Sequence, residues 1–418
     1  MADALTAPTP DGVARPQPLG AFPLPLGYLL VPGGADTDAV RRELVAGRVP
    51  DRWPAALRAH ERSLAGDRHG ALAALDDLPD AVARYNRFVL DPDAGDPDAL
   101  RGELGELAAL VDLVLFVLGR SDVAPQVGAL DGELAALVLA AQATAALGAG
   151  DGTGAVELLD RAVERAAPSS PPLAGLLLGA AGSILRDRDD PACVERFERA
   201  LTLLAGASAL HVGRAEIHLG LAHALHEQAR DRPELLPAAV PHYHSVLQLV
   251  GMREAPLTWA AAHAGLATAY LTMPMVEASS RLRLGIAAQS LRSALTVYTR
   301  EDHPAEWASV ALNLANSLVY APSRHQADNL IEAVGRYEEV LAIRDRATDP
   351  LGRARVLANL GTVLAHLGRF DDATARLREA RSLFEEHADD ESVHAVRGVL
   401  DEITRQAAPA AASTGVGT

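Results

Sequence analysis

The chain has 418 residues and a formal net charge of −17, and 49% of its residues are hydrophobic but only 4% aromatic. All 38 basic residues are arginines, which excludes a Schiff-base lysine, a Walker-type phosphate lysine and a kinase-type ATP lysine. The acidic balance argues against a nucleic-acid partner, because a phosphate-binding surface needs clustered positive charge. Abundant Ala and Leu, with few runs of β-branched residues, favour an all-α chain.

Residues 1–35 are rich in Pro, Gly and Ala and lack helical periodicity, so we expect a separate N-terminal segment. Asp3 and several prolines stand where a signal peptide would need a basic start and an apolar core. The most apolar run, residues 104–118, contains Glu106 and Asp112 and is too short to cross a bilayer. The sequence therefore predicts a cytoplasmic protein without a membrane partner.

Apolar residues 22–31 interrupt the otherwise bland N-terminal segment. Their prolines do not suit a helix, so we expect an extended strap that lies on the first helices. Docking of this strap on a partner is the alternative.

Residues 36–168 contain degenerate copies of a two-helix unit. The helical pattern starts at Asp36, with Thr37 or Asp38 as the cap. Helices or hairpins are expected over residues 53–78, 80–90, 98–118 and 134–166.

Two loops in this region resemble ligand-binding loops. Residues 91–98 bring four carboxylates together, but Asp96 stands where a calcium loop needs Gly, so we expect Asp96 or Asp98 to cap the next helix. Residues 148–154 look like a phosphate cradle, yet they follow an Ala-rich helix rather than a strand. A hairpin turn is therefore expected there.

From residue 169 to 405 the copies become regular, and each has a pair of apolar and small residues on its first helix. These anchor pairs are Leu178-Gly179, Leu219-Gly220, Leu266-Ala267, Leu314-Ala315 and Leu360-Gly361. Their spacing exceeds the roughly 34 residues of a standard helical-hairpin repeat. We expect the excess in extended second helices and in enlarged loops around residues 280–281 and 323–324. Residues 406–418 are expected to be a disordered tail.

The clearest two copies lie between Trp307 and Ala380. The first copy has Leu314, Ala315, Leu318, Ala333, Tyr337 and Val340, and the second has Leu360, Gly361, Leu364, Ala373, Leu377 and Ala380. This pattern resembles the tetratricopeptide repeat, and its long-loop form resembles repeats found beside CHAT domains in bacterial proteins. The resemblance implies a right-handed α-solenoid of stacked antiparallel hairpins, whose concave groove binds another protein.

The resemblance also implies contacts for that partner. Asn316 would hydrogen-bond a bound peptide main chain, whereas Asn313 and Asn359 fit packing between hairpins better. The family's carboxylate clamp for acidic C-termini uses lysines, which this chain lacks. The arginines that would replace them, if they face the groove, are Arg214, Arg281, Arg324 and Arg353.

Histidines are the one group that suggests chemistry. His211, His218 and His226 recur on one helical stripe, and His263 takes a first-helix position in the next copy. A zinc site needs three or four ligands at one point, and seven residues of helix separate two side chains by about 10 Å. Partly buried histidines are the favoured interpretation, and a histidine-dependent metal-binding hydrolase is the alternative. Cys193, the only cysteine, falls at a helix-packing position, and we predict no catalytic, metal-binding or cofactor-binding residue.

The sequence thus predicts a non-catalytic scaffold or adaptor that binds a partner protein in its groove. Two alternatives stay open. The first is an accessory factor for the assembly or regulation of a partner enzyme, either in metalloenzyme maturation or with a CHAT-type protease. The second is a homo-oligomer that stacks through its terminal hairpins.

Overall fold

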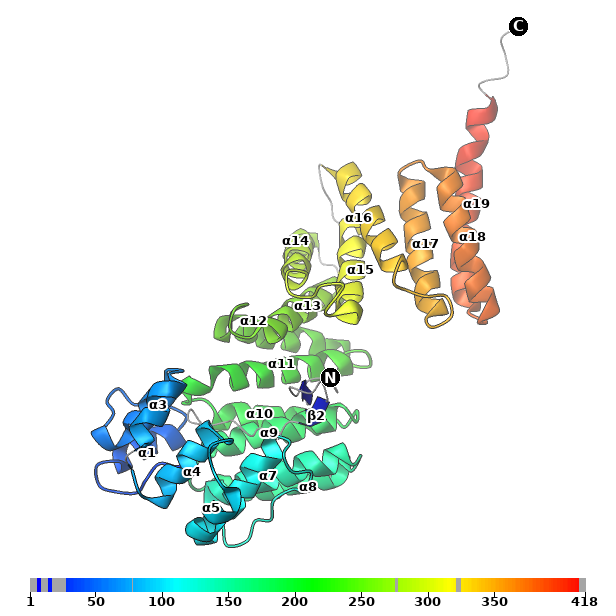
Figure 1. The fold of residues 1–418 in the computed structure, drawn as a ribbon. Coiled ribbons are helices and arrows are strands. Elements are labelled where there is room, and N and C mark those ends of the chain that lie inside the picture. The colour runs from blue at the N-terminus through cyan, green and yellow to red at the C-terminus, as the bar shows by residue number, and fades with distance from the viewer. Residues whose placement is uncertain are drawn as a thin grey trace. The chain divides into compact units, whose positions relative to one another are not determined.

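The computed structural model describes residues 6–8, 14–16, 28–76, 78–274, 277–320 and 325–412, without the side chains of residues 6–8, 14–16, 277–281 and 407–412. The chain divides into two compact units, residues 1–250 and 251–418 (Figure 1). Apart from one antiparallel ribbon, the described residues form helices and their connections, which confirms the predicted all-α solenoid class. Within these ranges, no helix is both long and apolar enough to cross a membrane.

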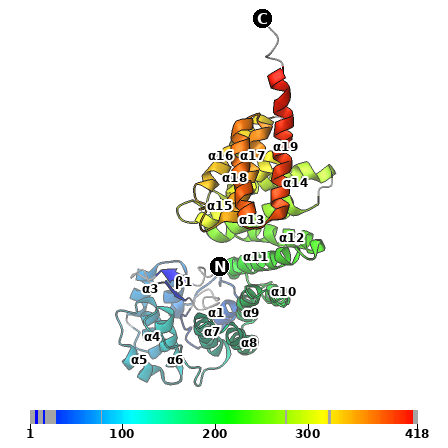
Figure 2. The same ribbon diagram turned by 90° about the vertical axis from the view of Figure 1, so that its right-hand side faces the viewer.

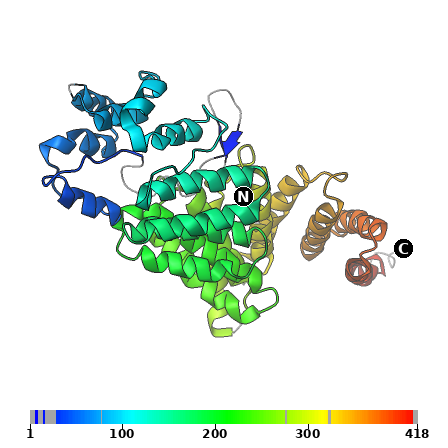
Figure 3. The same cartoon turned by 90° about the horizontal axis from the view of Figure 1, so that it is seen from below.

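The first unit contains the ribbon and the first twelve α-helices. Strand β1 (Thr6–Pro8) pairs with β2 (Ala14–Pro16). The helices are α1 (Asp38–Val45), α2 (Arg58–Leu64), α3 (Arg68–Leu75), α4 (Ala81–Leu90), α5 (Pro97–Leu104), α6 (Ala109–Val117), α7 (Gly132–Gly148), α8 (Gly152–Ala166), α9 (Pro171–Arg186), α10 (Cys193–Leu203), α11 (His211–Gln228) and α12 (Leu236–Leu249). Short 3-10 turns lie at Ala55–Leu57, Gly105–Leu107, Ser208–Leu210 and Pro233–Leu235. Helices α1 to α6 lie to one side of the stacked hairpins α7 to α12 (Figure 3).

The predicted strap lies on the first helices over residues 28–31, whereas residues 22–27 fall outside the described residues. Asn86 of α4 binds it with both ends of its amide. Leu30 N donates to Asn86 Oδ1 over 2.7 Å, and Asn86 Nδ2 donates to Leu30 O over 2.8 Å. His60 Nε2 also lies 2.9 Å from Leu30 O. Because Asn86 and His60 are each only 2% exposed, these bonds fix the strap in a buried setting.

The helix predicted over residues 98–118 is broken in the structure. Helix α5 ends at Leu104, and Gly105 has a φ of 55°, in the left-handed region that only glycine adopts without strain. A 3-10 turn follows before α6 begins at Ala109. The sequence did not mark this break, because a glycine is also tolerated inside a helix.

Both loops that resembled ligand sites are helix starts. Asp96 accepts a hydrogen bond from Asp98 N over 2.9 Å and caps α5. Asp151 accepts from Gly154 N over 2.8 Å and caps α8, directly after the end of α7. The predicted cap at Asp96 and the predicted hairpin turn at residues 148–154 are confirmed.

Glycines in the hairpin stack allow close helix packing. Phe197 of α10 is 1% exposed and lies against Gly182 of α9 and Gly220 of α11. A Cβ atom at Gly220 would stand 2.7 Å from Phe197 Cζ, and one at Gly182 would stand 3.0 Å from Phe197 Cε1. The aromatic ring therefore fills space that a larger residue on either first helix would occupy.

The second unit contains three hairpins and a final helix. Its helices are α13 (Pro256–Thr272), α14 (Glu277–Ala294), α15 (Pro304–Tyr320), α16 (Gln326–Leu341), α17 (Pro350–His366), α18 (Phe370–Glu386) and α19 (Asp390–Ala412). Each first helix packs on the second helix of its own hairpin, and α15 also contacts both α13 and α17. Helix α19 lies along α18 and covers the last hairpin (Figure 2). The first helices α13, α15 and α17 thus form one continuous layer.

Two expectations about the second unit were wrong in detail. Residues 280–281, predicted in an enlarged loop, lie inside α14, because the extra length of this repeat extends the helix. The tail predicted from residue 406 begins inside α19, which continues to Ala412. The other expected enlarged loop, at residues 323–324, lies outside the described residues.

Candidate functional site

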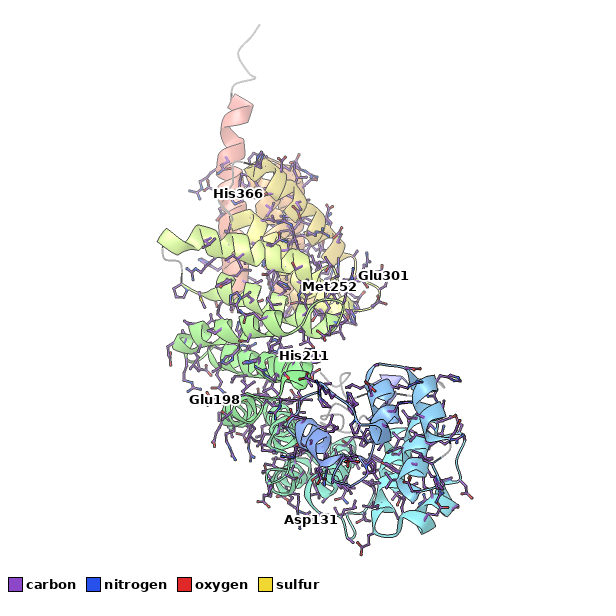
Figure 4. The ribbon with its side chains drawn as sticks, turned by 90° about the vertical axis from the view of Figure 1, so that its left-hand side faces the viewer. Asp131, Glu198, His211, Met252, Glu301 and His366 are labelled. Atoms are coloured by element: carbon purple, nitrogen blue, oxygen red, sulfur yellow. The ribbon has the colours of Figure 1, made fainter. Side chains whose placement is uncertain are left out.

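A hollow of about 360 Å³ opens on the layer of first helices in the second unit, and we call it the amide groove. It is lined by Thr268, Leu271, Thr272, Leu284, Asn313, Asn316, Ser317, Tyr320 and Asn359. Its volume falls in the range of pockets that hold small ligands or parts of a peptide. Met252 and Glu301 mark the chain before α13 and α15, and His366 marks the end of α17 (Figure 4).

The spacing of polar residues on α15 places them on one face of that helix. Asn313, Asn316, Ser317 and Tyr320 recur three or four residues apart, so their side chains lie above one another. The opposite face carries the buried anchor residues Leu314, Ala315 and Leu318. The same amphipathic pattern that packs α15 therefore presents its amides to the groove.

Asn316 lies at the centre of a hydrogen-bonded relay between helices. Its Oδ1 atom accepts from Tyr337 Oη of α16 over 2.6 Å and from Asn359 Nδ2 of α17 over 3.1 Å. Burial raises the pKa of Tyr337 above its ordinary value, so this hydroxyl stays protonated and remains a donor. The relay thus joins α15 to α16 within one hairpin and joins α15 to α17 of the next hairpin.

A second contact continues this pattern toward α13. Asn313 Nδ2 lies 3.5 Å from Thr268 Oγ1, and Thr268 Oγ1 donates its own proton to Ala264 O over 2.9 Å. The prediction that Asn313 and Asn359 connect neighbouring hairpins agrees with these bonds. However, all three asparagines also line the groove, so packing and lining are not separate roles here.

Sequence reasoning missed Thr268 and Tyr337 as parts of this site. Thr268 directly follows the anchor pair Leu266-Ala267, and Asn316 directly follows Leu314-Ala315. The shared repeat position was therefore a usable signal for Thr268. The repeat pattern includes Tyr337 but does not indicate its hydroxyl contact, which depends on the distance between two helices.

The groove lining has no Asp, Glu, Arg or His side chain among the described residues. Arg353 of α17 is occupied elsewhere: its guanidinium donates to Glu379 Oε1 over 3.2 Å, to Leu341 O over 3.1 Å and to Arg344 O over 3.0 Å. Arg324 and the side chain of Arg281 lie outside the described residues. Arg353 is thus a packing residue that holds the end of α16 against α17 and α18.

Arg214 lies on α11 in the first unit and is partly exposed. It forms no ion pair with the residues that the structure describes, and its charge contributes to lowering the pKa of His218. Arg214 therefore belongs to the surroundings of the histidines.

His218 of α11 and His242 of α12 face each other, with their Nδ1 atoms 3.0 Å apart and their ring centroids 5.2 Å apart. Burial, the neighbouring His242 and Arg214 lower the pKa of His218 to about 4. Burial also lowers the pKa of His242, against the opposing effect of Glu198, which is labelled on α10 in Figure 4. Both rings are therefore neutral at pH 7, and one donates to the other.

The other histidines make separate contacts. His226 Nδ1 lies 3.3 Å from Tyr243 Oη, and the His223 ring centroid lies 5.8 Å from that of Tyr243. His263, in the second unit, packs edge-on against Trp259 with ring centroids 4.3 Å apart. Across the described residues, no group of three or more His, Cys, Asp or Glu side chains is placed to hold a metal ion.

A second hollow, of about 460 Å³, lies beside the turn between α9 and α10. Its lining includes Arg186, Asp189, Cys193 and Glu227 and so mixes both charge signs. Cys193 is 2% exposed, and burial raises the pKa of its thiol above the ordinary value. This cysteine fits its predicted packing position and lacks the activation of a nucleophile.

One family model matches part of the second unit. Residues 308–386, from α15 to α18, match the family model described as Tetratricopeptide repeat. Among solved structures, the chain is similar to the crystal structure of the P58(IPK) TPR domain, with 14% sequence identity and a TM-score of 0.29, over 84% of this chain and 97% of that chain. The comparison with curated proteins gave no match.

Proposed function

Residues 308–386 are tetratricopeptide repeats, a fold that serves in general as a protein-interaction scaffold, and from this premise we propose that the amide groove binds an extended segment of a partner protein. The observation that carries the proposal is the row of amides on neighbouring first helices. Asn313 and Asn316 come from α15 and Asn359 comes from α17. Amide groups are neutral and can both donate and accept, which suits a peptide main chain.

The rim of the groove supports the same role. Tyr320 ends α15 and is 74% exposed, although it is a large aromatic residue. Leu271 and Leu284 form an apolar wall of the groove next to the amides. Exposed aromatic residues such as tyrosine are enriched in surfaces that bind proteins.

We propose that the protein is a non-catalytic cytoplasmic scaffold, with Asn316 as the central contact. Arg353 is left out of the contact set because its donors are engaged within the array. Arg214, Arg281 and Arg324 remain sequence predictions of partner contacts.

The proposal is tested by selecting peptides from a random-sequence display library against the whole protein. Tyr320→Ala removes an exposed side chain from the groove, and Ile331→Ala removes one of similar exposure, 61%, from α16 outside the groove lining. We expect Tyr320→Ala to weaken the selected peptides at least about tenfold, roughly 1.4 kcal/mol, and Ile331→Ala to leave their binding unchanged. Selected peptides that bind both variants as tightly as the parent protein would contradict the proposal.

A further inference from the structure

The strap, residues 28–31, is held on the helices by two side chains. Asn86 of α4 accepts from Leu30 N and donates to Leu30 O, and His60 of α2 contacts the same oxygen over 2.9 Å. In the described part of the chain, no hydrogen bond between main-chain groups joins residues 29–33 to another segment. Asn86 and His60 therefore supply the polar contacts that keep Leu30 in place.

The contact with Leu30 assigns the proton of the neutral His60 ring. A carbonyl oxygen only accepts hydrogen bonds, so His60 Nε2 carries the proton that it donates to Leu30 O. With the proton on Nδ1 instead, two lone pairs would meet at 2.9 Å. Nδ1 is thus the unprotonated nitrogen, and it is a buried atom without a hydrogen-bond partner in the described part of the chain. A second proton on this ring would add to Nδ1.

The surroundings of His60 offer no opposite charge to a protonated ring. The buried titratable groups on the strap and on α4 are Tyr28 and Tyr85, and burial raises the pKa of each, so both stay neutral. The other titratable side chains of α2, α3 and α4 are all exposed: Arg58, Glu61, Arg62, Arg68, His69, Arg84 and Arg87. A charge on His60 would therefore be buried without a partner.

We propose that acid releases the strap and that His60 is the proton sensor. A proton on Nδ1 creates an unpaired charge and an unbonded N–H group in a buried setting, and both favour a state that is open to water. The strap is the part that moves, because side chains hold it, whereas α2 and α4 are held by the main-chain hydrogen bonds of their own helices. After release, water hydrates the charged ring.

The direction of the pH effect follows from the burial of His60. Burial lowers the pKa of docked His60, and this effect outweighs the opposing effect of the bond to Leu30. In the released state the ring is hydrated, and its pKa returns to about 6.5. Docking is therefore favoured above pH 6.5 and weakens as the pH falls below it. Between pH 7 and pH 5 the released population can rise at most about 25-fold, the limit for a docked ring that never takes up a proton.

The amide hydrogen of Leu30 reports release of the strap, because it is bonded to Asn86 Oδ1 while the strap is docked. Hydrogen–deuterium exchange of the whole protein, measured by mass spectrometry with electron-transfer fragmentation, gives the protection factor of this amide at pH 7 and pH 5, after correction for the intrinsic exchange rate. We expect the factor to be at least fivefold lower at pH 5. Amides inside α4 should exchange more slowly than Leu30 at both pH values, because α4 stays folded.

Matched variants distinguish His60 from other histidines. His60→Gln keeps an amide N–H group for Leu30 O but cannot take up a proton, so the protection factor of Leu30 should change less than twofold between pH 7 and pH 5. His69→Gln removes an exposed histidine of α3 and should behave like the parent protein. Asn86→Ala removes both of its bonds to Leu30 and should lower the protection factor at least tenfold at both pH values, which verifies the reporter.

A protection factor of Leu30 that does not change with pH would overturn the proposal, and so would a fivefold fall that persists in His60→Gln. A fall shared by all amides of α4 would also overturn it, because acid would then unfold the region.

A second measurement covers the case in which His60→Gln does not dock the strap. In parent protein labelled with ¹³C-histidine, the ring resonance that is lost in His60→Gln should titrate together with the protection of Leu30. Titration without a change in that protection would contradict the proposal. The inference concerns the first unit, and it does not depend on the function proposed for the amide groove.

Discussion

At the scale of single residues, His218 and His242 show how burial changes the chemistry that a sequence suggests. The sequence placed His218 on a stripe of candidate metal ligands, whereas the structure pairs its Nδ1 atom with that of His242. Burial removes water from both rings and favours their neutral forms. The pair is therefore a neutral contact between α11 and α12.

A pH dependence of stability follows from this pair. The ordinary histidine pKa is about 6.5, so the unfolded chain takes up a proton near that pH, whereas folded His218 stays neutral until about pH 4. Its stabilising contribution is fully present above pH 6.5 and is lost as the pH falls toward 4. The midpoint of urea denaturation, measured by circular dichroism, should fall between pH 7 and pH 5 in the parent protein. We expect it to fall less in His218→Gln.

The control for this experiment is the exposed His394, in α19. In His394→Gln, the difference between the urea midpoints at pH 7 and pH 5 should equal that of the parent protein. An unchanged pH dependence in His218→Gln would show that the folded histidine is protonated like an unfolded one.

At the scale of helices, the packing of α17 on α18 depends on the absence of one side chain. A Cβ atom at Gly361 would stand 2.6 Å from Leu377 Cγ and 3.2 Å from Ala373 O, and the latter is backbone of α18. Gly335 lies in α16 with no atom within 4 Å of the corresponding position. Substitution by alanine is therefore expected to have opposite effects on stability at these two helical glycines.

We expect Gly361→Ala to lower the free energy of unfolding by about 1–3 kcal/mol, because an added methyl group must push the helices apart. Gly335→Ala should raise it by about 0.5–1 kcal/mol, because alanine is the better helix former in an exposed helix. Urea titrations of both variants measure these changes. A stabilising Gly361→Ala would mean that α17 and α18 can separate at little cost.

The repeat pattern predicted which segments form helices better than it predicted where each helix begins and ends. Anchor pairs such as Leu360-Gly361 mark close contacts, which recur in sequence and in space. Extra residues of the same composition can lengthen either a loop or a helix of a repeat. The sequence predicted a loop at residues 280–281, but these residues lie in a helix. Similarly, nothing in the residues around Gly105 distinguished a left-handed break from a helical glycine.

The candidate site was predictable only in part for a related reason. The position of Asn316 in the repeat predicts a place in the groove, and Asn316 lines the groove. The orientation of its amide depends on Tyr337 and Asn359, which lie on two other helices. Such contacts require the angle and distance between helices, which one sequence does not contain.

At the scale of the whole molecule, each compact unit contains a cluster of buried hydrophobic residues. One cluster of buried residues runs from Tyr28 to Ile184 in the first unit, and another runs from Ala260 to Ile403 in the second. In a helical array each hairpin contacts only its neighbours, so stability grows with the number of stacked hairpins. The second unit has three hairpins and the covering helix α19.

We expect a fragment of residues 251–418 to unfold cooperatively by itself when it is heated. Circular dichroism measures this transition. A matched fragment of residues 304–418 lacks α13 and α14, and with them the packing of α14 on α15 and the contact of Asn313 with Thr268. This shorter fragment should melt at a lower temperature. Equal melting temperatures would show that the first hairpin adds nothing to the unit.

The double acceptance by Asn316 also has a mechanical consequence. One donor belongs to the same hairpin and the other to the next, so the amide links two neighbouring hairpins. Bending α17 away from α15 would stretch the bond to Asn359 and leave the Asn316 amide held by Tyr337 alone. The angle between these two hairpins is therefore coupled to the hydrogen bonds of a side chain that lines the groove.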